Sequence, residues 1–192
     1  GYSDQWVKEA QKRGLSNIKT TPDALDAILS DKARSLFEKS EILNERELEA
    51  RYEIDLERYT KKIQIESRVM GDLAVNHVLP TAVAYQNVLI ENVTGLKQVL
   101  PESEFKKLAA EQLSMIREIS ERMTSIRQLV TEMTEARKAA NQQESVRGQA
   151  GEYCSSVFPF FDRIRREVDK LELLVSDEMW PLPKYRELLF NR

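Results

Sequence analysis

The feature that most constrains the fold is a run of mainly apolar residues that recur alternately at intervals of four and three. In the first segment these positions are Tyr52, Leu56, Tyr59, Ile63, Glu66, Met70, Leu73 and His77. In the second segment they are Phe105, Ala109, Gln112, Ile116, Ile119, Met123, Ile126, Val130, Met133, Arg137 and Ala140. In the third segment they are Ala150, Cys154, Val157, Phe161, Ile164, Val168, Leu171 and Val175. A period of 3.5 residues places these side chains on one stripe of an α-helix and favours left-handed supercoiling. The pattern therefore predicts three long helices that pack in heptads.

Short polar turns join these segments, which indicates that neighbouring helices run antiparallel. We expect helices at 44–99, 102–140 and 148–176, with bends where Pro80 and Pro159 remove a backbone donor. Six Gly and six Pro are too few for the frequent turns of a β-sandwich. The predicted fold is all-α: an elongated up-down-up antiparallel three-helix bundle with coiled-coil-like heptad packing, short N-terminal helices and a short C-terminal helix.

The two ends of the chain differ from this bundle. Residues 1–43 predict short helices, capped near Ser3, Thr21 and Ser30, that need a larger body to dock on. Residues 177–192 form an aromatic tail with two prolines, whose candidate docking residues are Trp180, Leu182, Tyr185 and Leu188. The tail docks either on its own bundle or on a partner. We expect both ends to pack near an overhanging end of the first long helix.

Composition excludes several classes of function. The net charge of −3 argues against a general nucleic-acid binder, and no window has the roughly 20 apolar residues that span a bilayer. One Cys and one His exclude an internal disulfide, a multi-Cys zinc site and paired Glu-x-x-His di-iron motifs. Glycine-rich phosphate loops are missing from the sequence as well. We therefore expect a cytoplasmic chain without a catalytic, cofactor or metal site of its own.

Four features that resemble chemical sites have structural interpretations that we favour. His77 suits a bundle histidine better than a catalytic base, and Cys154 suits a small buried apolar residue. Glu66 lies on the predicted stripe, where pairing with Arg137 or Gln112 would fix the helix register. The fourth feature is a basic cluster that alternates with acidic residues and indicates a solvated, ion-paired face rather than a phosphate site; it consists of Arg163, Arg165, Arg166 and Lys170.

Several sequence strings resemble one enzyme family. They are Gly1-Tyr2-Ser3-Asp4-Gln5-Trp6-Val7, Thr20-Thr21-Pro22-Asp23-Ala24-Leu25, Glu49-Ala50-Arg51-Tyr52-Glu53-Ile54, Leu79-Pro80 and the tail Trp180-Pro181-Leu182-Pro183-Lys184-Tyr185-Arg186-Glu187-Leu188-Leu189-Phe190. Together they resemble the C-terminal region of type III glutamine synthetases, and the resemblance extends over essentially the whole chain.

The resemblance implies a parent enzyme that joins glutamate and ammonia with ATP and Mg²⁺ or Mn²⁺, in a large oligomer of stacked hexameric rings. Because no position matches the family's catalytic motifs, we expect those ligands in an upstream catalytic domain and no activity in this chain alone. The implied role is assembly or regulation, and the implied partners are the catalytic domain and neighbouring subunits of the ring. The alternative is a free-standing coiled-coil adaptor that binds a protein partner through its aromatic tail.

Overall fold

The computed structural model describes residues 3–189, with the side chains of residues 185 and 186 outside the description, and this part contains helices and no strand. The elements are α1 (Asp4–Lys12), α2 (Thr21–Asp26), η1 (Ala27–Leu29), α3 (Asp31–Lys39), α4 (Glu45–Leu73), η2 (Ala74–Val78), α5 (Leu79–Val99), α6 (Glu102–Leu108), α7 (Ala110–Ala140), α8 (Val146–Glu152), η3 (Tyr153–Val157), α9 (Pro159–Leu174) and α10 (Tyr185–Leu189). None of the helices within 3–189 is both long enough and apolar enough to cross a membrane. The predicted all-α class is confirmed for the described residues.

Side-chain caps begin α1, α2, α3, α4 and α8. Ser3 and Ser30 cap α1 and α3, as predicted, by accepting hydrogen bonds from backbone amides. Asn44 caps α4 in a reciprocal arrangement, since the Glu47 carboxylate in turn accepts a hydrogen bond from the Asn44 amide. Thr20, and not the predicted Thr21, caps α2. Local polar chemistry therefore sets where the helices start.

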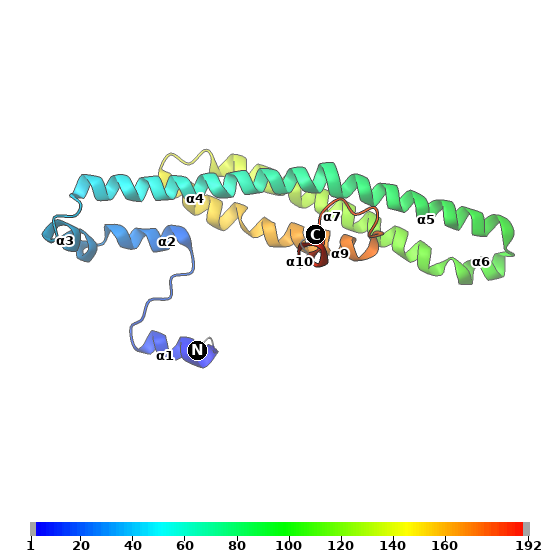
Figure 1. Ribbon diagram of the computed structural model, residues 1–192, viewed down its shortest axis with the longest axis horizontal. Helices are drawn as coiled ribbons and strands as arrows, with labels where there is room; N and C mark the ends of the chain where they lie inside the picture. Colours follow the sequence, from blue (N-terminus) through cyan, green and yellow to red (C-terminus); the bar gives the residue numbers. More distant parts are fainter. Residues whose placement is uncertain (1–2, 190–192) are drawn as a thin grey trace.

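The long first segment is one continuous rod made of α4, η2 and α5 (Figure 1). Its middle part, Ala74–Val78, is a π-helix in which the Leu79 amide bonds to the Ala74 carbonyl, five residues earlier. The third segment repeats this arrangement, because the Phe158 amide bonds to the Tyr153 carbonyl at 2.9 Å. Each π-helix ends two residues before a proline, where the wider turn leaves room for the ring of Pro80 or Pro159.

The chain runs along the rod three times. From the far end of α5 it turns through α6 into α7, which returns along the rod, and α8, η3 and α9 then run forward again (Figure 1). The largest fully buried side chains of these segments include Ile119, Ile126, Tyr153 and Ile164, which belong to one continuous core, and Leu56, which is buried outside it. The right-hand end in Figure 1 holds only α5, α6 and the first part of α7, because α9 stops short of it.

The burial pattern confirms the predicted stripes of the second and third segments and corrects the first. Glu66 and His77 were expected on the buried stripe, but both are exposed. Ala74 and Val78 are buried instead. The departure begins before the π-helix, because Ser67 is buried in place of Glu66, as the 3.6-residue period of a straight α-helix drifts away from a strict heptad. The π-helix then places one extra residue in the turn, which rotates the positions that follow it.

The N-terminal helices and the tail occupy different places. Helices α2 and α3 pack beside the first turns of α4, where the guanidinium of Arg34 forms ion pairs with Glu45 and Glu49. Helix α1 stands away from the rod on an extended segment (Figure 1). The tail packs near the middle of the rod, so the expectation that it joins the N-terminal helices at one end is wrong. Trp180 explains this position, because its ring belongs to the core.

Candidate functional site

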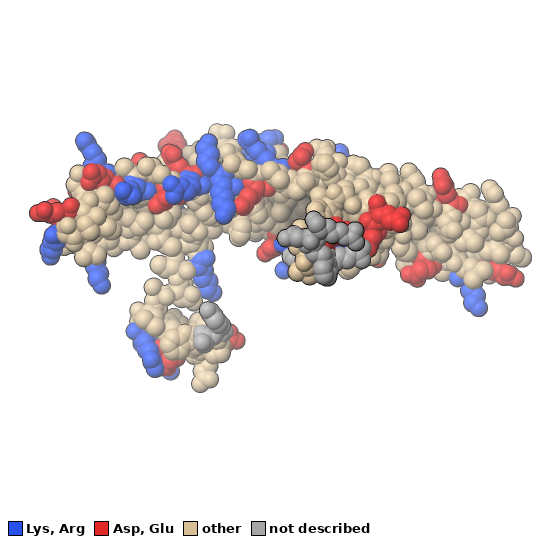
Figure 2. Space-filling model, viewed as in Figure 1, with Lys and Arg blue, Asp and Glu red and all other residues tan. Residues whose placement is uncertain are grey.

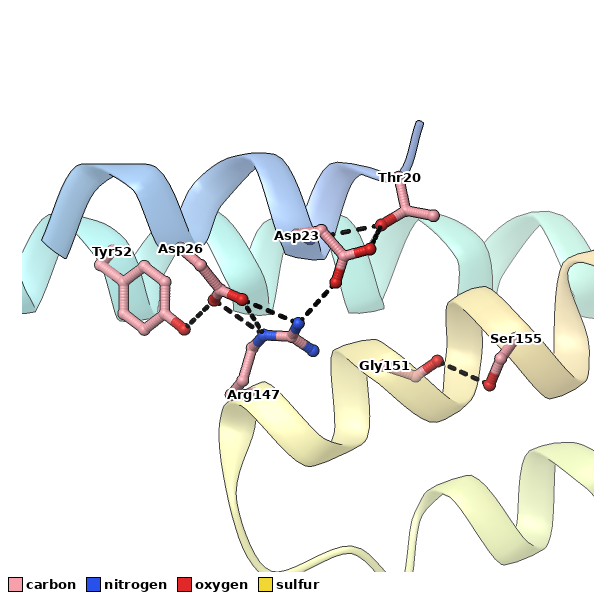
Figure 3. Close-up of polar contacts among 7 residues, drawn as sticks. All are labelled: Thr20, Asp23, Asp26, Tyr52, Arg147, Gly151 and Ser155. Atoms are coloured by element: carbon pink, nitrogen blue, oxygen red, sulfur yellow. Dashed lines mark hydrogen bonds and ion pairs between the residues drawn. The ribbon is translucent and has the colours of Figure 1, made fainter. Parts of the chain in front are cut away.

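The most highly connected polar site joins the N-terminal helices to the rod (Figure 3). We call it the Arg147 clamp; it consists of Thr20, Asp23, Asp26, Tyr52 and Arg147. The Arg147 Nε donates to both carboxylate oxygens of Asp26, at 2.8 and 3.1 Å, and its Nη2 donates to Asp23 at 2.8 Å. The Tyr52 hydroxyl donates to Asp26 at 2.7 Å. The clamp therefore holds α2, α4 and α8 together.

Charge stabilises this arrangement over a wide range of pH. The hydrogen bond from Arg147 lowers the pKa of Asp26 against the opposing effect of burial, and Tyr52 lowers it further. Burial and the Asp26 carboxylate raise the pKa of Tyr52 to about 12. Hydrogen bonding to Asp26 raises the pKa of Arg147. The clamp consequently keeps an ionised carboxylate, a neutral phenol and a cation near neutral pH, which suits a stable joint between helices.

The backbone around Arg147 leaves room for its guanidinium. Arg147 lies in the first turn of α8, and Gly151 follows one turn later. A Cβ on Gly151 would lie 3.1 Å from the Arg147 Nη1, so a larger residue there would crowd the guanidinium. The Gly151 carbonyl accepts a hydrogen bond from Ser155 at 2.9 Å (Figure 3). Gly151 lies in α8, within the third helix predicted at 148–176, and makes space for the clamp.

A second polar network lies next to the clamp, inside the rod. The Tyr153 side chain is completely buried, and its hydroxyl donates to Asn141 at 2.8 Å and accepts from Gln64 at 3.1 Å. Tyr59 is close by, where burial and the neighbouring Cys154 thiol raise its pKa. These contacts tie α4 to η3 and to the turn after α7, so they fix how the helices of this end align.

A third network joins α7 to α9. Arg122 donates to Glu167 at 2.9 Å and to Glu118 at 3.3 Å, and Lys170 donates to Glu167 at 3.2 Å. Burial alone would raise the pKa of Glu167, but the hydrogen bonds from Arg122 and Lys170 outweigh it and lower the pKa.

The basic cluster is largely ion-paired, as predicted. Arg163 faces Glu132 at 3.5 Å and Arg165 faces Asp169 at 3.6 Å. Lys170 forms the pair with Glu167. The interpretation as a solvated, ion-paired face therefore suits this part of α9.

The predicted docking residues of the tail have different environments. Trp180 is only 9% exposed and packs in the core, and Leu182 is half-buried beside it. Leu188 is 65% exposed. The side chain of Tyr185 lies outside the described residues. Lys184 also holds the tail, by an ion pair with Asp177.

An apolar groove of about 420 Å³ lies beside the tail, between the α4–η2 segment and α9. Its lining includes Ile65, Met70, Val78, Phe161, Val168 and Leu182. Glu66 contributes one of its few polar groups. The tail thus forms one side of the groove and leaves the rest open.

The remaining candidate residues do not come together. Glu66 is exposed, and neither an ion pair with Arg137 nor a hydrogen bond with Gln112 occurs in the described part of the chain, so the expected pairing of Glu66 is wrong. Cys154 is a half-buried free thiol beside Tyr59, in a more polar setting than expected. Residues 3–189 contain no group of three or more His, Cys, Asp or Glu side chains that could hold a metal ion.

Sequence reasoning missed the Arg147 clamp. One signal was present: Asp23 and Asp26 are three residues apart on a short helix, so their carboxylates share a face. Their cation lies 121 residues from Asp26 in the sequence, and only the packing of α8 on α2 and α4 identifies it.

Comparison with known proteins identifies the family of this chain. Residues 1–97 match the family model described as "Glutamine synthetase C-terminal domain". The chain belongs to the glutamine synthetase C-terminal domain family. The resemblance found in the sequence is thereby confirmed. The matched residues include α1 to α5 almost completely, and with them four of the five clamp residues.

Individual relatives extend the similarity over the whole chain. A "Glutamine synthetase" of Bacteroides fragilis (strain YCH46) is 47% identical over 192 residues, which are all of this chain and 26% of the relative. A "Type-3 glutamine synthetase" of Dictyostelium discoideum is 35% identical, with 26% of its length covered, and a "Glutamine synthetase" of Butyrivibrio fibrisolvens is 31% identical, with 27% covered. The chain thus spans about a quarter of the length of these relatives.

Glutamine synthetase chemistry implies ATP and a divalent metal. Residues 3–189 offer no cluster of metal-ligating side chains, and the groove beside the tail is lined mainly by apolar side chains. The described residues therefore do not fit a binding site for ATP or for a divalent metal, and no catalytic step is assigned to them.

Proposed function

We propose that this chain is the helical C-terminal domain of a type III glutamine synthetase, a cytoplasmic enzyme that ligates ammonia to glutamate with ATP and Mg²⁺ or Mn²⁺. In this proposal the domain acts in assembly of the enzyme, and the chemistry takes place in a catalytic domain elsewhere in the parent chain. The family match and the relatives, of which this chain spans about a quarter, support the proposal.

The observation that carries the assembly role is the exposed apolar side of the N-terminal arm, by which we mean α1 and the extended segment that joins it to α2. Trp6 and Val7 on α1 are 42% and 43% exposed, and Leu15 and Ile18 on the extended segment are 54% and 49% exposed. A run of exposed apolar residues at one end of a chain marks a surface that another body covers. We assign it to the catalytic domain of the parent enzyme.

The clamp gives this arm a fixed base. The extended segment joins α2 at Thr20, whose hydroxyl caps α2 and also donates to Asp23, and Asp23 is held by Arg147. The arm is thereby anchored to α8 as well as to α4. We propose that the three-helix bundle, with coiled-coil-like heptad packing, serves as a rigid spacer in a ring-shaped homo-oligomer, with the tail as a docking segment of its surface.

The test compares the parent enzyme with a variant that lacks these 192 residues. Sedimentation velocity should show loss of the full assembly in the truncated enzyme. The isolated chain should be helical by circular dichroism and make no glutamine from glutamate, ammonia, ATP and Mg²⁺ or Mn²⁺. An unchanged assembly after truncation, or glutamine synthesis by the isolated chain, would refute the proposal.

A second variant separates the arm from the rest of the domain. In the parent enzyme, Trp6→Asp places a charge on the exposed face of α1 and should weaken assembly. Lys8→Asp is the matched control, because it adds an acidic residue to the same helix at a position that is already polar. Equal effects of the two substitutions would contradict the role of the apolar face.

A further inference from the structure

The apolar groove beside the tail has more room than the described part of the tail uses. Its volume is about 420 Å³, whereas a cavity of roughly 150 Å³ in a protein interior already holds a benzene ring. Ile65 and Val69 of its α4 wall are 59% and 51% exposed. Charged side chains are dense over the α4 part of the rod (Figure 2), but the charged residues that line the groove are Glu66 and Arg165 alone. A hollow of this size and composition marks a place that an apolar group occupies.

The described chain ends close to this groove. The tail reverses direction after α9 (Figure 1), and the ammonium group of Lys184 holds it beside the end of that helix. This group forms an ion pair with Asp177 and donates a hydrogen bond to the Glu172 carbonyl at 3.4 Å. Helix α10 begins directly after this anchor, where the Lys184 amide donates to the Glu187 carboxylate at 3.1 Å. Residues 190–192 therefore continue from a point that is fixed one short helix earlier.

The length of chain beyond the anchor matches the distance to the groove. On α9 the lining residues nearest to Glu172 are Val168 and Arg165, four and seven residues earlier, which corresponds to about 6 and 10 Å along the helix axis. Phe190 follows Lys184 by six residues, so a helical segment advances it by about 9 Å and an extended one by up to about 20 Å. A tail that runs back along α9 therefore brings Phe190 level with the lining residues of that helix.

The chemistry of segment 190–192, whose sequence is Phe190-Asn191-Arg192, also suits the groove. The phenyl ring supplies an apolar group, and burial of an aromatic side chain removes about 150–250 Å² from water. Glu66 is an exposed carboxylate at the groove and has no ion pair within residues 3–189. Arg192 follows Phe190 by two positions and supplies a cation for this carboxylate.

We propose that segment 190–192 docks in the apolar groove of its own chain. The Phe190 ring lies between Val69 of α4 and Val168 of α9, and the Arg192 guanidinium pairs with the carboxylate at the edge of the groove. Because the anchor at the end of α9 keeps the segment at a high effective concentration near the groove, it competes well against a separate chain. The docked segment is a strap that joins α4 to α9 and keeps an apolar surface away from other proteins.

The first experiment measures thermal unfolding of the chain by circular dichroism. Phe190→Ala should lower the melting temperature by roughly 3–10 °C, because a buried phenylalanine ring stabilises the fold. Leu188→Ala is the matched control from the same tail; Leu188 is 65% exposed, so its melting temperature should change by less than about 2 °C. Equal melting temperatures of Phe190→Ala and the unmodified chain overturn the proposal.

A double substitution shows where the ring docks. Val69→Asp places a charge in the wall of the groove and should expel the ring, so that adding Phe190→Ala lowers the melting temperature no further. Val88→Asp is the matched control, because Val88 is 50% exposed on α5 and is not among the lining residues. In the Val88→Asp chain Phe190→Ala should keep its full effect. An equal effect of Phe190→Ala in both backgrounds overturns the docking site.

Reversing the charges tests the orientation of the segment. Glu66→Arg and Arg192→Glu should each lower the melting temperature by about 1–3 °C, and the chain that carries both should recover most of this loss. A double variant that is no more stable than the two single ones overturns the pairing of Arg192 with Glu66.

Cross-linking distinguishes the segment of the same chain from that of a second copy. With Cys154→Ser as background, a chain that carries Val69→Cys and Phe190→Cys should form an internal disulfide under mild oxidation and remain monomeric on a non-reducing gel. The Cβ atoms of a disulfide lie about 4 Å apart, so the reaction reports direct contact. The control pair Val88→Cys and Phe190→Cys should stay reduced. A disulfide-linked dimer of the first chain, or no disulfide at all, overturns the proposal.

These experiments are independent of the assembly role. They measure contacts within a single chain, so a failure of the strap leaves the proposed function standing. Conversely, an assembly that survives truncation of the parent enzyme would refute the proposed function without affecting the strap.

Discussion

Replacing Trp180 with alanine tests how the tail is held. The indole is 9% exposed and packs with the core of the same chain. A buried tryptophan removes about 150–250 Å² from water, which at ~25 cal/mol per Å² corresponds to about 4–6 kcal/mol. Residual burial in the unfolded chain reduces this value by roughly 10–40%. We therefore expect Trp180→Ala to lower the free energy of unfolding by about 3–4 kcal/mol.

The assay is thermal and urea unfolding followed by circular dichroism. For a chain of this length each kcal/mol shifts the melting temperature by about 2–4 °C, so the midpoint should fall by roughly 6–15 °C. Leu188→Ala is the control from the same tail, and since Leu188 is 65% exposed it should change stability by less than about 0.5 kcal/mol. A Trp180→Ala midpoint within about 2 °C of the unmodified chain would show that the tail does not pack on its own bundle.

Four further predictions concern the polar networks. Arg147→Ala should lower the free energy of unfolding by about 1–2 kcal/mol, because it removes half-exposed ion pairs, and it should speed hydrogen exchange in α2. Arg58→Ala is the control: its ion pair is largely exposed, so the substitution should change neither the free energy of unfolding nor the exchange in α2. The pKa of Tyr52 is raised to about 12, so its stabilising contribution is present below pH ~10 and is lost as the pH rises toward 12; Tyr52→Phe should reduce that alkaline loss in urea titrations. The pKa of Asp26 is lowered, so the stability that its carboxylate contributes is present above pH ~3.9 and is lost as the pH falls below that value. Asp26→Asn should therefore lose less stability in acid than the unmodified chain, and equal acid sensitivity of the two would contradict this. Tyr153→Phe should lower the free energy of unfolding by about 1–2 kcal/mol through its lost hydrogen bonds.

Local chemistry made much of the helical structure predictable. The Asn44 cap begins α4, and the regular four-and-three spacing predicts the buried positions of α7 and α9, such as Ile119 and Ile164. These signals act within a few residues, so a single sequence contains them. The sequence strings that resemble type III glutamine synthetases likewise predicted the family, and the family match of residues 1–97 confirms it.

Longer-range features were not predictable in the same way. The stripe of α4 was expected to continue through Glu66 and His77, but Ser67 is buried in place of Glu66, and Ala74 and Val78 of the π-helix before Pro80 are buried in place of His77. Nothing in the local spacing distinguishes a π-turn from an α-turn. The Arg147 clamp depends on packing among three helices, and the position of Trp180 depends on its contacts with a core built from residues distant in the sequence.

The two π-helices make the number of residues in each helix as important as their identity. Each residue advances an α-helix by about 100°, so inserting one further residue into Ala74–Val78 would turn all of α5 by that amount. After such an insertion Leu89 would move out of the core and part of the opposite face would move inward. Deleting one residue would instead remove the extra residue of the π-helix and restore an ordinary α-turn, with α5 in its present orientation. The same holds for Tyr153–Val157 and α9, so insertions should be rarer than deletions at both places during the divergence of the family.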